Sequence, residues 1–408
     1  MSNVLVSNLS LDKYAPVVGD QKISKIRELA GKATGKTVCH INSTSFGGGV
    51  AEILHRLVPL MQDVGLKAEW KLIQGSDEFF NVTKAFHNGL QGMNIPLTEE
   101  MKTTYLKNNE ANAHELDLHH EFVVIHDSQP AAVINYQKNK TGKWVWRCHI
   151  DLSTPNPAFT NFLTPPISQY DALIFTMAQY APESLKQRKL AVIPPSIDPL
   201  SDKNKPLSEG IVRAKLDKYG VDPERPIITQ VSRFDPWKDP LGVIDAYRIV
   251  KKEIPTLQLL MIASMAKDDP EGWSYFEKTA RHAGDDSDIH LLTDLKGVGN
   301  IEVNAFQRAS DVILQKSTRE GFGLTVTEGL WKEVPVIGGN AGGIPLQIIH
   351  GENGFLVNSV QEAAERTLYL LKHPAEAKRM GAKGKEHVRK NFLITRHLED
   401  YLNLFASI

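Results

Sequence analysis

The chain has 408 residues, of which 41% are hydrophobic and 23% charged, and its formal net charge is -1. This length suits two domains, and the balanced charge indicates neither a nucleic-acid nor a membrane-surface partner. The only cysteines, Cys39 and Cys148, are not in a C-x-x-C motif, which excludes a disulfide framework and argues against a thiolate metal site. Without a signal-peptide pattern at its start or an apolar run of about 18 residues, the chain is expected to be cytoplasmic.

The first half begins with a strand–loop–helix–strand pattern. A strand is predicted over Thr37–Ile41, followed by a loop with three consecutive glycines, Gly47–Gly49. A helix with one apolar face follows, and then a second strand over Ala68–Ile73, which together predict a parallel βαβ unit. Glycines let the backbone approach a ligand closely, although a tight turn without a ligand is the alternative. Because the loop is not G-x-G-x-x-G, the pattern does not indicate a dinucleotide site.

Three further strands are predicted before a proline-rich break. They cover Phe122–Ile125, Ala172–Thr176 and Leu190–Ile193. The prolines of residues 194–199 interrupt both helix and strand, so this segment and residues 201–206 form the best candidate linker. The expected division is a first domain over residues 1–198, a second over residues 199–385, and a C-terminal helix over residues 386–408 that packs back on the first.

A second set of alternating strands and helices follows the linker. The predicted strands are Ile227–Ser232, Leu257–Ile262, His290–Leu292, Val312–Leu314, Val334–Ile337 and Phe355–Val357. Helices fit between most of them, notably over Gly242–Lys252. The predicted fold class is therefore α/β, with two doubly wound Rossmann-like domains. Such domains bind ligands at the carboxyl ends of their strands, so we expect a cleft between them.

The most informative stretch is Arg319–Trp331, with the sequence R-E-G-F-G-L-T-V-T-E-G-L-W. Glycines between a predicted strand and a predicted helix leave backbone N–H groups free at the helix start, which favours an anion. The two carboxylates, Glu320 and Glu328, are acceptors only and suit hydroxyl groups. The stretch therefore predicts a site for a ligand with both phosphates and hydroxyls, such as a nucleotide sugar.

Two cations follow the first strand of the second half. Arg233 and Lys238 lie five positions apart in one loop, S-R-F-D-P-W-K-D. Together they could hold a diphosphate and stabilise the negative charge that grows on it when its bond to a sugar breaks. The alternative is a surface arginine and lysine paired with Asp235 and Asp239.

Polar residues also follow the strands of the first half. Asp127, in H-D-S-Q-P, and His149, in C-H-I-D, are placed to contact an acceptor sugar. His126 is interpreted as a structural histidine. These residues and Asp151 do not have the spacing of a metal site, so no metal is predicted. The tryptophans at positions 144, 146, 237 and 331 are interpreted as packing residues.

These motifs resemble the retaining nucleotide-sugar glycosyltransferases of the GT-B type, which have two Rossmann-like domains. E-G-F-G-L-T-V-T-E resembles their E-x7-E motif, and S-R-F-D-P-W-K-D resembles their diphosphate-binding segment. The chain is more similar still to the trehalose glycosyltransferring synthases. The phrases I-N-S-T-S-F-G-G-G-V-A-E-I-L-H, I-H-D-S-Q-P, C-H-I-D-L-S-T-P-N and I-P-P-S-I-D-P-L carry this resemblance in the family's order.

The resemblance implies a role for each matching residue. Catalytic roles fall on Glu320, Arg233, Lys238 and Asp127. The donor-binding set is Arg233, Lys238, Glu320, Gly321, Phe322, Gly323, Leu324, Thr325, Glu328, Gly48 and Gly49, with Glu320 on the donor sugar and Glu328 on the ribose. The acceptor-binding set is Asp127, His149 and Gly48. The glycine loop would close over the donor phosphates and the acceptor.

The implied reaction is reversible transfer of glucose, with retained configuration, from a nucleoside-diphosphate glucose to glucose, which forms trehalose. No cofactor and no metal are expected, and the partners are small-molecule substrates, with a homodimer as a possibility. Other acceptors remain open, including glucose 6-phosphate and polyols. The loops of the first half show no clear basic cluster, which favours free glucose, although Arg147 and Lys143 keep a phosphorylated acceptor open. A disaccharide phosphorylase and a non-catalytic sugar-nucleotide binding protein are further alternatives.

Overall fold

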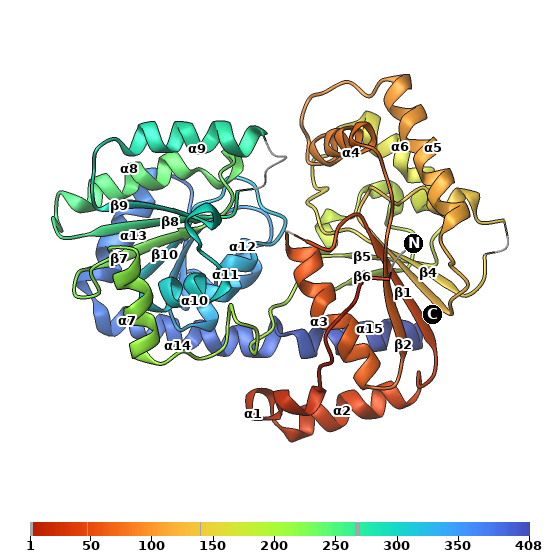
Figure 1. The fold of residues 1–408 in the computed structure, drawn as a ribbon, viewed down its shortest axis with the longest axis horizontal. Helices are drawn as coiled ribbons and strands as arrows, with labels where there is room; N and C mark the ends of the chain where they lie inside the picture. Colours follow the sequence, from red (N-terminus) through yellow and green to blue (C-terminus); the bar gives the residue numbers. More distant parts are fainter. Residues whose placement is uncertain (1–2, 47, 139, 266–269) are drawn as a thin grey trace. The chain divides into compact units, whose positions relative to one another are not determined.

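A computed structural model of the chain describes residues 3–46, 48–138, 140–265 and 270–408. Internal contacts divide the chain into two units. Unit 1 comprises Met1–Ser196 together with Ile394–Ile408, and unit 2 comprises Ile197–Leu393. Each unit contains a six-stranded sheet in which every neighbouring pair of strands is parallel (Figure 1). Among the described residues, no helix is long and apolar enough to cross a membrane.

Unit 1 is built on strands with the order β2-β1-β3-β4-β5-β6. The strands are β1 (Thr37–Asn42), β2 (Lys67–Leu72), β3 (Phe122–His126), β4 (Lys143–Arg147), β5 (Ala172–Phe175) and β6 (Leu190–Val192). The helices are α1 (Ala15–Val18), α2 (Asp20–Gly31), α3 (Gly49–Asp63), α4 (Asp77–Leu90), α5 (Glu99–Glu115), α6 (Pro157–Ile167) and α15 (Ile394–Ser407). Short 3-10 helices are η1 (Leu11–Tyr14), η2 (Val133–Tyr136), η3 (Ala178–Tyr180) and η4 (Glu183–Leu185).

Helix α15 packs against α2 and α3 (Figure 1). The apolar side chains of these helices join those of the unit 1 sheet in one core. Alternate residues of β1, such as Val38, and of β3, such as Val124, contribute to this core, as do Leu398 and Leu402 of α15. Side chains alternate between the faces of a strand, so His40, two residues after Val38, lies on the same face of the sheet. The carboxyl-terminal helix is thus part of unit 1.

Unit 2 has the strand order β12-β11-β10-β7-β8-β9. The strands are β7 (Ile227–Val231), β8 (Gln258–Ala263), β9 (Ile289–Thr293), β10 (Val312–Gln315), β11 (Val336–Gly339) and β12 (Gly354–Val357). The helices are α7 (Glu209–Lys218), α8 (Pro240–Lys251), α9 (Pro270–Ala283), α10 (Asn300–Ala309), α11 (Leu324–Trp331), α12 (Ile344–Gln347), α13 (Val360–Lys372) and α14 (Pro374–Asn391), with 3-10 helices η5 (Pro236–Lys238) and η6 (Asp294–Lys296). Two buried apolar clusters pack against this sheet, one with α8 and α13 and one with α7 and α10.

The structure confirms the predicted α/β class and adds one strand. β4 was not predicted because its sequence, K-W-V-W-R, places charged residues at both ends and lacks a run of aliphatic residues. Trp144 and Trp146 are nevertheless fully buried, as predicted for packing residues, and so are Val145 and Arg147. Burial on both faces of a central parallel strand explains why β4 shows no polar–apolar alternation.

Candidate active site

The strand order of unit 2 reverses between β7 and β10, which pair directly. Loops that follow two strands at such a reversal leave the same edge of the sheet in opposite directions and form a ligand site in many doubly wound folds. The loop after β7 carries Arg233 and Lys238, and the loop after β10 carries Glu320. Chain topology therefore explains how residues more than eighty positions apart come together.

Lys238 and Glu320 form the central contact of this edge. The Lys238 ammonium donates to Glu320 Oε2 at 2.5 Å, and Ser317 Oγ donates to the same oxygen at 3.2 Å. Both charged side chains are largely buried, with 16% and 11% of their areas exposed. The Glu320 carboxylate thus accepts from two donors that follow different strands.

Arg233 contacts a different carboxylate, Asp235. Its Nη2 lies 3.5 Å from Asp235 Oδ2, and two thirds of the arginine side chain is exposed. Asp235 Oδ1 accepts from the Lys238 backbone N–H at 3.0 Å, which fixes the turn between the two cations. Burial raises the pKa of Asp235, while the Lys238 and Arg233 cations act in the opposite direction. The alternative pairing considered from the sequence is thus present at Asp235, and the exposed guanidinium can also meet an anion.

The glycine loop before α11 has the geometry that its sequence predicts. Gly323 has a φ of 86°, a left-handed conformation that favours glycine, and directly precedes the first helical residue, Leu324. A Cβ at Gly323 would lie 3.2 Å from Glu320 Cγ. Thr325 also belongs to the first turn, whose N–H groups point away from the helix. Gly321 and the buried Phe322 complete the loop.

Glu328 lies in a different environment from Glu320. It is on α11 and fully buried, where Oε1 pairs with Lys203 Nζ at 2.7 Å and Oε2 accepts from Gln307 at 3.4 Å. The two carboxylates of the E-x7-E motif are therefore held by different cations. The sequence did not indicate Lys203, because it precedes Glu328 by more than a hundred residues.

A second lysine that the sequence analysis missed follows β10. Lys316 is buried and pairs with the Asp239 carboxylate, whose Oδ1 also accepts from Gly242 N–H at 3.1 Å and caps α8. Asp239 has a φ of 49°, which is uncommon for a residue other than glycine. The predicted Asp239 partner is thus Lys316 rather than Lys238.

In unit 1 the strand order reverses between β1 and β3, and Asp127 follows β3 at this point. It has a left-handed φ of 62°. Its N–H donates to Arg147 O at 2.8 Å, its carbonyl accepts from Trp146 Nε1 at 2.8 Å, and Oδ1 accepts from His149 N–H at 2.7 Å. Burial raises the pKa of Asp127 to about 6, against the opposing effects of the His149 N–H and the Arg147 cation.

The glycine-rich loop follows β1 at the same edge. Gly48 has a φ of 86° and precedes α3, which begins at Gly49. The predicted Gly47 lies outside the described residues. Just before it, the Phe46 ring is 81% exposed, although its N–H donates to Thr44 Oγ1 at 3.1 Å.

Three histidines form a hydrogen-bonded chain behind this edge. His149 Nε2 lies 2.9 Å from His126 Nδ1, and His126 Nε2 lies 3.0 Å from His40 Nδ1. His40 and His126 are buried, and His149 is partly exposed. Burial lowers the pKa of His40 to about 3 and the pKa values of the other two well below the usual range, so all three rings are neutral. The structural contact predicted for His126 is therefore present.

Arg147 is a buried cation near Asp127. Its side chain has no exposed area, and none of its three guanidinium nitrogens has a hydrogen-bond partner among the described residues. Burial lowers the pKa of Arg147, while the nearby Tyr401 and Asp127 act to raise it. Within the part of the chain that the structure describes, no carboxylate pairs with this guanidinium, whereas Arg233 in unit 2 pairs with Asp235.

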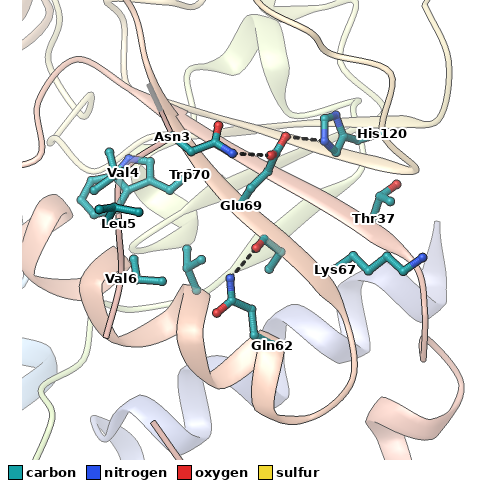
Figure 2. A pocket seen from close by; sticks show the side chains of 12 residues that line it. Asn3, Val4, Leu5, Val6, Thr37, Gln62, Lys67, Glu69, Trp70 and His120 are labelled. Atoms are coloured by element: carbon teal, nitrogen blue, oxygen red, sulfur yellow. Dashed lines mark hydrogen bonds and ion pairs between the residues drawn. The ribbon is translucent and has the colours of Figure 1, made fainter. Parts of the chain in front are cut away.

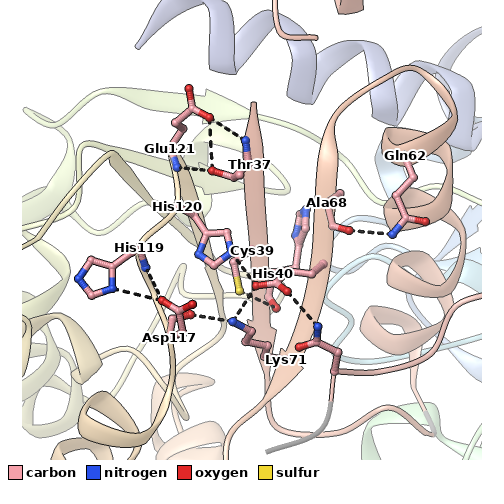
Figure 3. Close-up of polar contacts among 12 residues, drawn as sticks. Thr37, Cys39, His40, Gln62, Ala68, Lys71, Asp117, His119, His120 and Glu121 are labelled. Carbon is pink, nitrogen blue, oxygen red and sulfur yellow. Dashed lines mark hydrogen bonds and ion pairs between the residues drawn. The ribbon is translucent and has the colours of Figure 1, made fainter. Parts of the chain in front are cut away.

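A separate polar cluster lies on β1, β2 and the segment before β3. Among the described residues, Cys39, Glu69 and His120 are the one group of potential metal ligands close enough together. Glu69 already accepts from Lys71 at 2.7 Å, from His120 Nε2 at 2.6 Å and from Asn3 at 2.9 Å (Figures 2 and 3). The Lys71 ammonium supplies the charge that a metal would bring, so this cluster does not fit a metal site.

An open pocket of about 490 Å³ borders the same cluster (Figure 2). The N-terminal residues Asn3–Val6 line it together with Glu69 and Trp70. Val4 N–H donates to Trp70 O at 2.8 Å, which holds the N-terminal segment along β2. None of the predicted site residues lines this pocket.

Two parallel doubly wound sheets define the chain as a GT-B fold. A solved structure described as trehalose-6-phosphate synthase has the same fold, with a TM-score of 0.75 and 14% identity over 91% of this chain and 99% of that one. The family profile "Glycosyl transferases group 1" matches residues 212–387, and "Trehalose synthase, N-terminal domain" matches residues 40–182.

The relatives in sequence are more specific. A trehalose synthase of Thermococcus litoralis is 57% identical over 399 residues, which cover 97% of each chain. The chain therefore belongs to the trehalose synthase family. It is a glycosyltransferase, and the reaction it catalyses is related to trehalose. A trehalose phosphorylase of Pleurotus pulmonarius is more distant, with 29% identity over 85% of this chain and 54% of that one.

Proposed function

We propose that the protein transfers glucose from a nucleoside-diphosphate glucose to free glucose, with retention at the anomeric carbon, and so forms trehalose. The observation that carries the proposal is the Lys238–Glu320 contact at the strand reversal of unit 2, with Arg233 exposed in the same loop. Cations in place before the reaction stabilise the charge that develops on a leaving diphosphate. A carboxylate beside them suits the hydroxyls of the sugar being moved.

In the proposed reaction, the bond from the anomeric carbon to the donor phosphate oxygen breaks while a bond to an acceptor hydroxyl oxygen forms on the same face. The acceptor proton passes to the leaving phosphate oxygen, and a nucleoside diphosphate is released. Lys238 and Arg233 stabilise this leaving group, and Glu320 binds donor hydroxyls. The residues act by positioning and by charge stabilisation.

Asp127 and His149 are assigned to the acceptor, with Gly48 and Gly49 in the loop beside them. One Asp127 oxygen accepts from the His149 N–H, which leaves the other available for a sugar hydroxyl. In the ribose role assigned to Glu328, the side chain must exchange its contact with Lys203 for a contact with the nucleotide, because it is fully buried.

The two basic residues that kept a phosphorylated acceptor open are poorly placed for it. Arg147 has no exposed area, and Lys143 lies at the opposite end of β4 from Arg147. Four residue steps along a strand separate them by roughly 13 Å. This placement supports free glucose as the acceptor.

A product screen tests the proposal. The protein is incubated with ADP-, UDP- or GDP-glucose and, in separate reactions, with glucose, glucose 6-phosphate or fructose, and the product is identified by NMR. We expect α,α-trehalose and a nucleoside diphosphate from glucose. Transfer to glucose 6-phosphate alone would contradict the proposed acceptor. Reaction only in a parallel incubation of trehalose with inorganic phosphate would instead indicate a phosphorylase.

A further inference from the structure

The geometry of the three-histidine chain limits where its ring protons can lie. Each neutral imidazole has one N–H, so three rings hold three ring protons. The two contacts, His149 to His126 and His126 to His40, use one proton each. The third proton must therefore lie at one end of the chain, either on His40 Nε2 or on His149 Nδ1.

The inner end of the chain, at His40, is unsuited to the third proton. His40 Nε2 is buried and has no hydrogen-bond partner among the described residues. An N–H buried without an acceptor loses its hydrogen bond to water and gains nothing in return. His149 is partly exposed, so an N–H on its Nδ1 can reach water or a ligand.

The charged groups nearest the chain of histidines lie toward its His149 end. Arg147 on β4 is the register partner of His126 on β3. Its cation lowers the pKa values of both His126 and His149. Asp127, by contrast, is bound to the His149 backbone at the outer end. At the His40 end, the ring of Tyr401 from α15 lies 5.8 Å from the His40 ring and supplies no carboxylate.

We propose that His40 and His126 are positioning residues that fix His149 in the tautomer with the proton on Nδ1, so that His149 donates a hydrogen bond to an oxygen of the sugar substrate. His40 Nδ1–H donates to His126 Nε2, His126 Nδ1–H donates to His149 Nε2, and His149 Nδ1–H faces the substrate. Once His40 Nε2 carries no proton, the two contacts between the rings fix the position of each remaining proton. The contact with the sugar rests on the proposed function, whereas the tautomer does not.

The tautomer can be measured directly in the full-length protein. In a ¹⁵N-histidine-labelled sample, two-bond ¹H–¹⁵N correlations distinguish the two neutral forms, and a His149→Gln sample identifies the His149 signals. We expect His149 in the Nδ1–H form, which is not the form that free histidine prefers. An Nε2–H form, a mixture of both forms or an imidazolium would overturn the proposal.

A matched pair of variants tests the role of His126. An asparagine amide occupies the place of Nδ1, so His126→Asn can still donate to His149, whereas the longer glutamine amide of His126→Gln reaches the place of Nε2. We expect His126→Gln to return His149 to the Nε2–H form and to lower kcat/KM about tenfold, with His126→Asn within about threefold of wild type. An unchanged His149 tautomer in His126→Gln would overturn the proposal.

His40→Gln and His40→Asn repeat the comparison one ring further in, if His126→Gln does not fold. Nucleoside-diphosphate affinity serves as a control, and we expect it to be unchanged in all four variants because the charged residues assigned to the diphosphate, Arg233 and Lys238, belong to unit 2. If the wild type forms no trehalose while His149 shows the Nδ1–H form, the proposed function fails and the tautomer assignment stands.

Discussion

The charged side chains at the two strand reversals are balanced in different ways. In unit 2 each acidic residue near the reversal has a cationic partner, as in Lys238–Glu320, Lys316–Asp239 and Lys203–Glu328. In unit 1 the Asp127 carboxylate is held by a backbone N–H, the neighbouring histidines are neutral, and none of the described carboxylates pairs with the Arg147 cation. Movable cations suit a phosphate ligand, whereas neutral donors and acceptors suit hydroxyls. The comparison therefore supports a donor site in unit 2 and an acceptor site in unit 1.

The largest effect is expected when the charge of Glu320 is removed. Glu320→Gln keeps the shape of the side chain but leaves Lys238 without its counter-charge and weakens acceptance from sugar hydroxyls. We expect kcat/KM for trehalose formation to fall about thousandfold. Glu352→Gln is the control, since Glu352 forms an exposed ion pair with Lys383 at 3.9 Å. Activity of Glu320→Gln close to that of the control would remove Glu320 from the site.

The next largest effect is expected on the pH dependence of stability, through Asp127 in unit 1. Burial raises the pKa of Asp127 from an ordinary value of 3.8 to about 6, so folding favours the protonated carboxyl. Its contribution is fully present below pH 3.8 and is lost as pH rises through about 6, a change of about 3 kcal/mol. Relative to Asp127→Asn, the wild type should thus lose unfolding free energy between pH 4.5 and 7.5. Urea titrations that remain parallel for the two proteins over this range would contradict it.

The buried pair of unit 2 should respond in a different way. Glu328→Gln leaves the partly buried Lys203 ammonium without its counter-charge, so we expect unfolding free energy to fall by about 1–3 kcal/mol. The double variant Glu328→Leu with Lys203→Met should recover part of this loss. Lys372→Met, which breaks an exposed pair with Glu253, serves as the control and should leave stability unchanged. Equal stability of Glu328→Gln and the control would show that the pair is not stabilising.

The smallest effect is expected at the exposed arginine. Arg233→Ala should weaken nucleoside-diphosphate binding about tenfold in calorimetry, because one charge-assisted contact is lost. Arg213→Ala removes another exposed arginine, paired with Glu224 at 3.1 Å, and should leave the affinity unchanged. Equal affinities in both variants would remove Arg233 from the diphosphate site.

Much of this arrangement is predictable from local sequence patterns. Short apolar runs and glycine loops predict the α/β fold, because central parallel strands are buried on both faces and their loops need left-handed residues such as Gly323. The placement of Lys238, Glu320 and Asp127 beyond the ends of strands follows from the same patterns. Local patterns do not predict the strand order, which brings the loop after β7 and the loop after β10 together.

The contacts that the sequence did not indicate join distant elements. The Lys203–Glu328 pair and the contact from His40 to His126 depend on tertiary packing rather than on a local spacing. β4 was missed because a strand buried on both faces can carry Trp144, Trp146 and Arg147 without an aliphatic run. An unpaired buried arginine has no signature in sequence, since its environment alone makes it unusual.

Steady-state kinetics of one variant from each unit test the division of roles most directly. Lys238→Met and Asp127→Asn are each assayed with the donor and the glucose acceptor varied separately. We predict that Lys238→Met raises the KM for the nucleoside-diphosphate glucose and leaves the KM for glucose unchanged, and that Asp127→Asn does the reverse. A raised donor KM in Asp127→Asn with an unchanged glucose KM would contradict the assignment of the donor to unit 2 and the acceptor to unit 1.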